Sequence, residues 1–255
     1  MTLTLNFTEV GSGPPLILLH GLFGSGRNWN AIARQLGERF RVLTPDLRNH
    51  GNSPWDETMD YPALAADVRT LIERESLAPC AVLGHSMGGK TAMLLALESP
   101  DLVERLMVVD IAPVDYPDQH SGYINAMRGL DLDRISRRGE ADAALKTAIP
   151  EPDIRGFLLQ NLLQRGERFE WRLNLDVLAE QLHRILSFPD LPPEQHYPGP
   201  ALVIGGDRSD YILPEHHAAI HQRLPEARIE MIAGASHWVH AEKPQQLLDR
   251  LLAFL

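Results

Sequence analysis

A serine flanked by glycines is the first candidate for chemistry, in the run Gly84-His85-Ser86-Met87-Gly88. A serine hydroxyl is a poor nucleophile at neutral pH unless a base lies within hydrogen-bond reach and the turn exposes its oxygen. Glycines on both sides permit a sharp turn from a strand into a helix, with Ser86 at the apex. The backbone N–H of Met87 would begin that helix, where negative charge is stabilised. Ser86 is therefore the candidate nucleophile, and Met87 a candidate oxyanion donor.

The same residues also match the phosphate-binding loop of nucleotide-binding proteins, because Lys90 and Thr91 follow the glycines. The apolar run that ends at Asp110 even resembles the strand whose aspartate helps to hold magnesium in those proteins. The local sequence therefore leaves two chemistries open. Acyl transfer further requires a histidine base and a second oxyanion donor elsewhere in the chain, and nucleotide binding does not.

A histidine suited to act as the base stands near the end of the chain. His237 falls between a predicted strand, Arg228–Ile232, and the final predicted helix. Loops at the carboxyl ends of parallel strands meet at one edge of a sheet, so we expect His237 to reach Ser86 there. His240 follows three residues later and is expected at the entry of the helix or at the rim of the site.

A second oxyanion donor is expected from the loop His20–Gly24, which directly follows an apolar run. Its glycines let the backbone turn inward, so that the N–H of Leu22, or alternatively that of Phe23, joins the N–H of Met87. His20 itself is expected to hold the loop in place.

The acid that would orient His237 has more than one candidate. Asp110 ends one apolar run, whereas Asp207 and Asp210 follow the predicted strand Ala201–Gly205. Either position gives the chain order serine, aspartate, histidine. Aspartate is also common after strands simply as a turn residue. The residues alone therefore leave the acid open.

The elements that must position these residues alternate between short apolar runs and longer amphipathic patterns, which is typical of a mostly parallel sheet with helices on both faces. The predicted strands are Leu3–Thr8, Pro15–His20, Phe40–Thr44, Cys80–Leu83, Arg105–Asp110, Ala201–Gly205 and Arg228–Ile232. The alternation stops from about Asp115 to Pro198, where the sequence becomes helical and more charged. A structureless loop of that length is uncommon. We therefore interpret residues 115–198 as a helical cap (lid) inserted into a core of residues 1–114 and 199–255.

Composition argues against several kinds of partner. The chain has 24 Lys and Arg against 34 Asp and Glu, a formal net charge of −10, so nucleic acid is not expected to bind. The single cysteine, Cys80, cannot form an intramolecular disulfide and is expected to be buried. We find no signal-peptide pattern and no run of the ~20 apolar residues that span a bilayer. A cytoplasmic monomer or homodimer is expected, with no membrane partner, metal or organic cofactor.

Five motifs taken together resemble the α/β-hydrolase esterases of the bacterial YbfF type, which are related to abhydrolase domain-containing protein 11. The motifs are His20-Gly-Leu-Phe-Gly-Ser25, Asp46-Leu-Arg-Asn-His-Gly51, Gly84-His-Ser-Met-Gly-Gly-Lys90, Asp110-Ile-Ala-Pro-Val-Asp-Tyr116 and His237-Trp-Val-His-Ala-Glu-Lys-Pro244. The resemblance spans roughly Pro15 to Leu255 outside the predicted cap. It implies that Lys90 and Thr91 belong to a hydrolase helix rather than to a phosphate loop.

The resemblance and the residues together predict a serine esterase of the α/β-hydrolase fold that acts on small to medium carboxylic esters. Ser86, His237 and Asp110 would form its triad, with Asp210 as the alternative acid. Related reactions of a serine triad, such as thioester or lactone hydrolysis, stay open, as does a hydrolase-like fold that only binds a ligand. Aromatic side chains are expected to line the substrate pocket, and the candidates are Phe23, Trp171, Tyr211 and Trp238.

Overall fold

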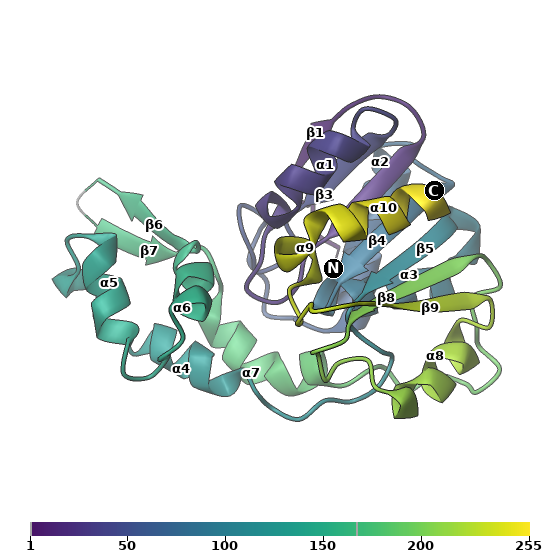
Figure 1. Cartoon of the computed structure of the whole chain (residues 1–255). Helices are drawn as coiled ribbons and strands as arrows, with labels where there is room; N and C mark the ends of the chain where they lie inside the picture. The colour runs from purple at the N-terminus through teal and green to yellow at the C-terminus, as the bar shows by residue number, and fades with distance from the viewer. Residues whose placement is uncertain (1, 167) are drawn as a thin grey trace.

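A seven-stranded sheet forms the centre of the molecule, whose computed structural model describes residues 2–166 and 168–255 (Figure 1). The strand order is β1-β3-β2-β4-β5-β8-β9. Strand β1 pairs antiparallel with β3, and the other neighbours pair in parallel. The predicted mostly parallel sheet is therefore confirmed. Its strands are β1 (Phe7–Val10), β2 (Pro15–Leu19), β3 (Arg41–Pro45), β4 (Cys80–His85), β5 (Val103–Val109), β8 (Ala201–Gly206) and β9 (Ala227–Ile232).

The first strand begins later than the predicted Leu3–Thr8. The Leu3 N–H donates a hydrogen bond of 2.7 Å to Asp67, and the Asn6 N–H donates one of 2.9 Å to Ser53. These side chains, rather than a neighbouring strand, accept the N–H groups of Leu3 and Asn6. The apolar alternation therefore predicted too early a start for β1.

Helices cover both faces of the sheet. Two helices pack on one face, and these are α1 (Asn30–Leu36) and α10 (Pro244–Phe254), the second preceded by the short α9 (Val239–Glu242). Three others pack on the opposite face, and these are α2 (Tyr61–Arg74), α3 (Met87–Glu98) and α8 (His217–Arg223).

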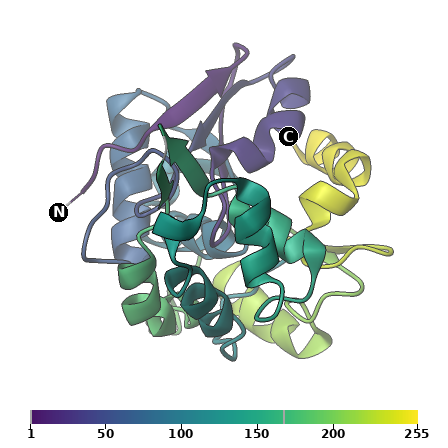
Figure 2. The same ribbon diagram turned by 90° about the vertical axis from the view of Figure 1, so that its left-hand side faces the viewer.

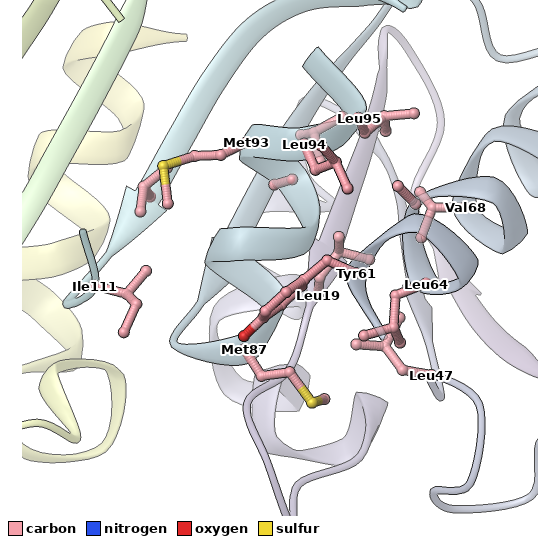
Figure 3. Packing of buried hydrophobic residues seen from close by; sticks show 14 of the residues in the cluster. Leu19, Leu47, Tyr61, Leu64, Val68, Met87, Met93, Leu94, Leu95 and Ile111 are labelled. Atoms are coloured by element: carbon pink, nitrogen blue, oxygen red, sulfur yellow. The ribbon is translucent and has the colours of Figure 1, made fainter. Parts of the chain in front are cut away.

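The alternation of side chains along each strand explains this two-sided core. Leu18 of β2 belongs to the cluster under α1 and α10, whereas its neighbour Leu19 belongs to the cluster under α2 and α3. Figure 3 shows part of the cluster under α2 and α3, in which Leu19 lies among Tyr61 and Leu64 of α2 and Met87 of α3. The sheet is thus buried on both faces, and its loops are left to carry the chemistry.

Between β5 and β8 the chain leaves the sheet and forms a separate group of elements, seen on the left of Figure 1 and in front of the core in Figure 2. The helices of this group are α4 (Ser121–Arg128), α5 (Arg138–Leu145), α6 (Pro152–Leu159) and α7 (Leu175–Leu186). The group also holds an antiparallel pair of strands, β6 (Leu162–Arg165) and β7 (Arg168–Trp171). The sequence predicted only helices here, so the segment differs from that prediction. Few residues of these two strands are buried, so their sequence lacks the apolar run by which a strand is recognised.

This segment contacts the loops at the carboxyl ends of the strands. Asn161 donates a hydrogen bond of 2.8 Å to the Phe23 carbonyl, which follows β2. The Asn174 N–H donates one of 3.1 Å to the Asn49 carbonyl, which follows β3. The segment therefore lies over the edge of the sheet where sites of open α/β proteins are built.

Candidate active site

Ser86 lies at a sharp turn between β4 and α3. Its backbone has a φ of 53° and a ψ of −121°, an unfavourable conformation for a residue with a side chain. A Cβ atom on Gly84 would overlap the Gly88 carbonyl, and one on Gly88 would lie 2.5 Å from the Leu19 carbonyl oxygen. The two glycines therefore allow β4, α3 and the end of β2 to approach closely enough to form this turn.

His237 connects Ser86 to Asp110 through its two ring nitrogens. The Nε2 atom lies 3.1 Å from Ser86 Oγ, and the Nδ1 atom lies 2.8 Å from Asp110 Oδ2. Asp110 is fully buried, and it also accepts hydrogen bonds from the Gly206 N–H and from the Ser209 hydroxyl. These two donors and the ring of His237 fix the orientation of the Asp110 carboxylate, as the acid member of a triad requires.

The structure does not bring the other two aspartates to His237. Asp207 is exposed, and its carboxylate accepts a hydrogen bond of 2.7 Å from the Gly234 N–H. Asp210 is exposed on the loop after β8. Asp110, from the strand next to β4, is thus the carboxylate that meets the ring.

Two further histidines, His85 and His240, lie near His237. Among the described residues, neither of them forms a hydrogen bond with Ser86 Oγ. His85 Nε2–H donates a hydrogen bond of 2.8 Å to the His237 carbonyl and so fixes the loop that carries the base. Burial holds the pKa of His85 well below its usual value, and the neighbouring His240 and His237 add to the effect. Burial likewise lowers the pKa of His240 to about 4. Both rings are therefore neutral at pH 7.

The loop after β2 is held by two histidines. His20 accepts a hydrogen bond of 2.9 Å from the Leu47 N–H through Nε2 and donates one of 2.9 Å to the Gly21 carbonyl. The Phe23 N–H is occupied, since it donates to His50 Nε2 at 3.3 Å. The N–H groups of Leu22 and Met87 have no hydrogen-bond acceptor within the described part of the chain. Leu22, rather than Phe23, thus has a donor free for a ligand.

Two hollows meet at Ser86. The larger holds about 600 Å³ of space, part of it open to solvent, and both Phe23 and Trp238 line it as predicted pocket residues would. The smaller is lined by Tyr211, whose ring stacks on His237 with centroids 4.0 Å apart. Trp171 lies elsewhere. It is on β7, where it packs against an apolar cluster that includes Leu162 and Phe169 of the two strands β6 and β7, and it lines a different surface hollow. The structure therefore brings three of the four aromatic candidates to the site and not Trp171.

Lys90 is engaged in a way that a phosphate loop does not allow. Its side chain is 1% exposed, and Nζ donates hydrogen bonds of 2.9 Å to the carbonyls of Leu186 and Ser187 at the end of α7. Burial lowers its pKa to about 7. Thr91 donates to the Met87 carbonyl at 2.9 Å. Both residues thus serve the fold, and the phosphate-loop alternative is wrong.

Sequence reasoning missed residues that reach the site from distant segments. Ser209 contacts Asp110 from the loop after β8, and His120 lines both hollows from the segment before α4. His85 was noted only as part of the serine motif. Neither Ser209 nor His120 belongs to a recognisable motif, because long-range packing alone places them.

The fold and the serine–histidine–aspartate arrangement define a class of protein, the α/β hydrolases. A family model described as the alpha/beta hydrolase family matches residues 16–250, and the chain belongs to this family. It is 46% identical over 250 residues to the sn-1-specific diacylglycerol lipase ABHD11 of Mus musculus, and this match covers 95% of the chain and 81% of the lipase. It is 36% identical over 242 residues to esterase YbfF of Escherichia coli (strain K12), and this match covers 94% of the chain and 92% of the esterase.

A solved structure agrees with these relatives. The chain resembles a marine microorganism esterase with a TM-score of 0.97, at 37% identity and over the full length of both chains. The predicted α/β-hydrolase fold and the resemblance to YbfF-type esterases are therefore confirmed. Relatives with these names support a carboxylic ester hydrolase.

Proposed function

We propose that this chain is a serine esterase that cleaves small to medium carboxylic esters through an acyl-enzyme. The observation that carries the proposal is the continuous contact from Ser86 Oγ to His237 Nε2, at 3.1 Å, and from His237 Nδ1 to Asp110 Oδ2, at 2.8 Å. This arrangement gives a serine hydroxyl the base that it lacks in water.

The reaction proceeds in two steps. In the first, Ser86 Oγ attacks the ester carbonyl carbon while His237 Nε2 takes its proton, and the imidazolium then protonates the departing alcohol. In the second, His237 takes a proton from a water molecule whose oxygen attacks the acyl carbon. The imidazolium then returns that proton to Ser86 Oγ as the bond between Oγ and the acyl carbon breaks and the acid leaves. Asp110 orients the ring and stabilises its positive charge without accepting the proton.

The oxyanion formed in each step is stabilised by the N–H groups of Leu22 and Met87. Met87 begins α3, where the N–H groups point outward and the helix dipole favours negative charge. Removal of one such donor typically slows turnover about 10²–10³-fold. The His20–Gly24 loop supplies the second donor, and the hydrogen bonds of His20 and of His50 hold that loop in place.

Residues 115–198 act as the cap of the enzyme. Lining residues of the larger hollow come from both sides, with Phe23 and Trp238 from the core and Tyr123 and Phe157 from this segment. Cap and core therefore select the substrate together. The same triad geometry also suits thioesters and lactones, which differ from esters in the leaving group and not in the attack on the carbonyl.

A fluorophosphonate probe tests the nucleophile. The wild-type protein should be labelled and should hydrolyse p-nitrophenyl esters, with the rate falling as the acyl chain grows beyond medium length. Ser86→Ala should abolish labelling and lower kcat by about 10⁴-fold or more, while the exposed control Ser12→Ala retains both. Labelling that persists in Ser86→Ala would overturn the proposal. Comparison of oxygen esters with thioesters of the same acyl group would separate the esterase from the thioesterase.

A cytoplasmic location and a monomeric or dimeric state stay predictions from the sequence. Within the described residues, no helix combines the length and the apolar character that crossing a bilayer requires. The described residues also hold no group of three or more His, Cys, Asp or Glu side chains placed to bind a metal ion. The proposed cycle uses protein groups and water alone.

A further inference from the structure

The ring of Tyr211 stacks on the ring of His237. The two ring centroids lie 4.0 Å apart, and the ring planes meet at 23°. By comparison, the ring of His85 lies 4.7 Å from that of His237 at 43°, and the ring of Trp238 lies 6.4 Å from it at 57°. Among the described side chains, Tyr211 thus makes the closest and most nearly parallel ring contact with the proposed base.

This contact restrains a motion of His237 that its hydrogen bonds leave free. The contacts with Ser86 Oγ and Asp110 Oδ2 are made through the two ring nitrogens. They hold the imidazole within its own plane, whereas a parallel ring on one side limits tilting out of that plane. The face of a phenol ring is also negative, so it stabilises the imidazolium that forms during proton transfer. The position of Tyr211 therefore affects the rate of the chemical step.

The hydroxyl of Tyr116 holds Tyr211 in place. It donates a hydrogen bond of 2.7 Å to the Tyr211 carbonyl and accepts one of 2.9 Å from the Ala112 N–H. Because the N–H of Ala112 can only donate, the hydroxyl proton is left for the carbonyl. Burial raises the pKa of Tyr116 above its usual value, so the hydroxyl keeps this proton at neutral and moderately alkaline pH. One hydroxyl thus joins the chain after β5 to the loop after β8.

The other backbone contacts of Tyr211 are longer. Its N–H donates a hydrogen bond of 3.3 Å to Ser209 Oγ. His216 Nδ1 lies 3.2 Å from the Tyr211 carbonyl, but the Leu213 N–H donates to the same nitrogen, which must then be unprotonated. His216 Nδ1 therefore cannot donate to this carbonyl, and the Tyr116 hydroxyl is its donor.

Tyr116 is itself fixed at the base of residues 115–198. Its N–H donates a hydrogen bond of 3.0 Å to the Leu186 carbonyl at the end of α7. Lys90 Nζ lies 4.9 Å from the centroid of the Tyr116 ring and donates to the same Leu186 carbonyl at 2.9 Å. The hydroxyl of Tyr116 therefore has a defined position from which to hold Tyr211.

We infer that Tyr116 is a positioning residue whose hydroxyl holds the ring of Tyr211 against His237. The inference rests on the proposed esterase function of Ser86 and adds a residue that acts on the base through a second side chain. It also links the start of the proposed cap to the reacting groups. Tyr116 lines the smaller hollow, but its hydroxyl proton is engaged, so we do not expect it to take part in the reaction itself.

A double-mutant cycle tests whether Tyr116 acts through Tyr211. We would measure kcat and KM with p-nitrophenyl butyrate, and also the rate at which a fluorophosphonate labels Ser86. Tyr116→Phe keeps the ring and should lower kcat and the labelling rate about 5-fold, with KM nearly unchanged. Tyr211→Leu should lower kcat about 10-fold. In the Tyr211→Leu background, Tyr116→Phe should cause no further loss, because the side chain through which it acts is gone.

Two further variants separate the ring contact from general effects on the fold. Tyr211→Phe keeps the aromatic ring and should recover most of the kcat that Tyr211→Leu loses. Tyr197→Phe is the matched control, because it removes another hydroxyl that donates to a main-chain carbonyl, that of Val103, at 2.9 Å. Val103 begins β5, at the opposite end of the strand from Asp110, so this variant should lose stability but keep its kcat.

Three results with Tyr116→Phe would overturn the inference. They are an unchanged kcat, a loss of the same size in the Tyr211→Leu background, and a loss that falls on KM alone. An equal loss of kcat in Tyr197→Phe would also overturn it, because general destabilisation would then explain the effect.

Tyr116 is half-buried and phenylalanine keeps its ring, so we expect Tyr116→Phe to fold. If it does not, Tyr211→Leu decides the question. A kcat equal to that of the wild type would overturn the inference, and a loss that Tyr211→Phe recovers would support it. Failure of the proposed function looks different, because then the wild type is neither labelled at Ser86 nor able to hydrolyse the ester.

Discussion

The strand ends that carry Ser86 and Asp110 differ from residues 115–198 in how they are held in place. Ser86 and Asp110 both adopt a φ of 53°, and their N–H groups bond to Val109 and Ile204 of neighbouring strands at 3.0 and 2.8 Å. Residues 115–198 meet the core through apolar packing and through separate hydrogen bonds, such as that of Asn161 with the Phe23 carbonyl. The positions of the reacting atoms therefore depend on the sheet, whereas the walls of the cavity depend on contacts that single substitutions can remove.

The largest expected effect comes from the sheet side of this comparison. Asp110→Asn should lower kcat on p-nitrophenyl butyrate by about 10⁴-fold, because an amide no longer holds the required tautomer of His237 or stabilises its cation. Asp210→Asn is the matched control and should retain nearly full activity, since that side chain is exposed. A loss of similar size in Asp210→Asn, with an active Asp110→Asn, would show that the acid comes from the loop after β8.

The second largest effect is expected from acid, which should lower the free energy of unfolding through the buried histidines near the strand ends. Burial lowers the pKa of His50 to about 3, with the neighbouring His20 adding to it, and burial also lowers the pKa values of His20 and His85. Below pH 6.5 the unfolded chain binds protons that the native chain does not, so the free energy of unfolding falls as pH falls. Each fully buried histidine contributes up to about 1.4 kcal/mol per pH unit. Urea unfolding at pH 7 and pH 5 measures this loss, and equal stability at both would contradict it.

Lys90 joins the two regions and should give the smallest effect. Burial lowers its pKa to about 7, so between pH 7 and its unfolded value near 10.5 the unfolded chain binds a proton that the native chain has lost. Its contribution to the free energy of unfolding therefore rises with pH in that range, by at most about 1.4 kcal/mol per unit. Lys90→Met should reduce this rise between pH 7.5 and 9 in urea unfolding. Identical pH slopes in the two proteins would show that Lys90 stays protonated.

Local features of the sequence are enough to single out Ser86 and His237 as the candidate nucleophile and base, and the structure brings the two side chains together. The glycines around Ser86 permit only a narrow range of turns, and a histidine on the loop after the last strand must reach the same edge of the sheet. The acid was harder to choose, since Asp110 and Asp210 each come after a strand. Strand order and burial bring Asp110, and not Asp210, to the ring of His237, and neither can be obtained from the spacing of residues along the chain.

The cavity walls could be predicted only in part, for a related reason. Phe23, Tyr211 and Trp238 lie close in sequence to the oxyanion loop, the β8 loop and the base, so the sheet carries them to the site. Trp171 belongs to a hairpin that the sequence pattern did not reveal, and its ring packs away from the serine. Whether such a residue lines the cavity depends on tertiary contacts that no short motif encodes.

The strand β5 ends at Asp110, and the chain departs for residues 115–198 directly afterwards. The proposed nucleophile and the proposed acid thus come from one β-α-β unit that is complete before residues 115–198 begin, and His237 follows after they end. The register of β4 and β5 is set by their direct pairing, which involves no residue of the segment 115–198. For enzyme engineers, the same junction offers a place to graft another segment in exchange for the proposed cap while Ser86 and Asp110 stay where they are.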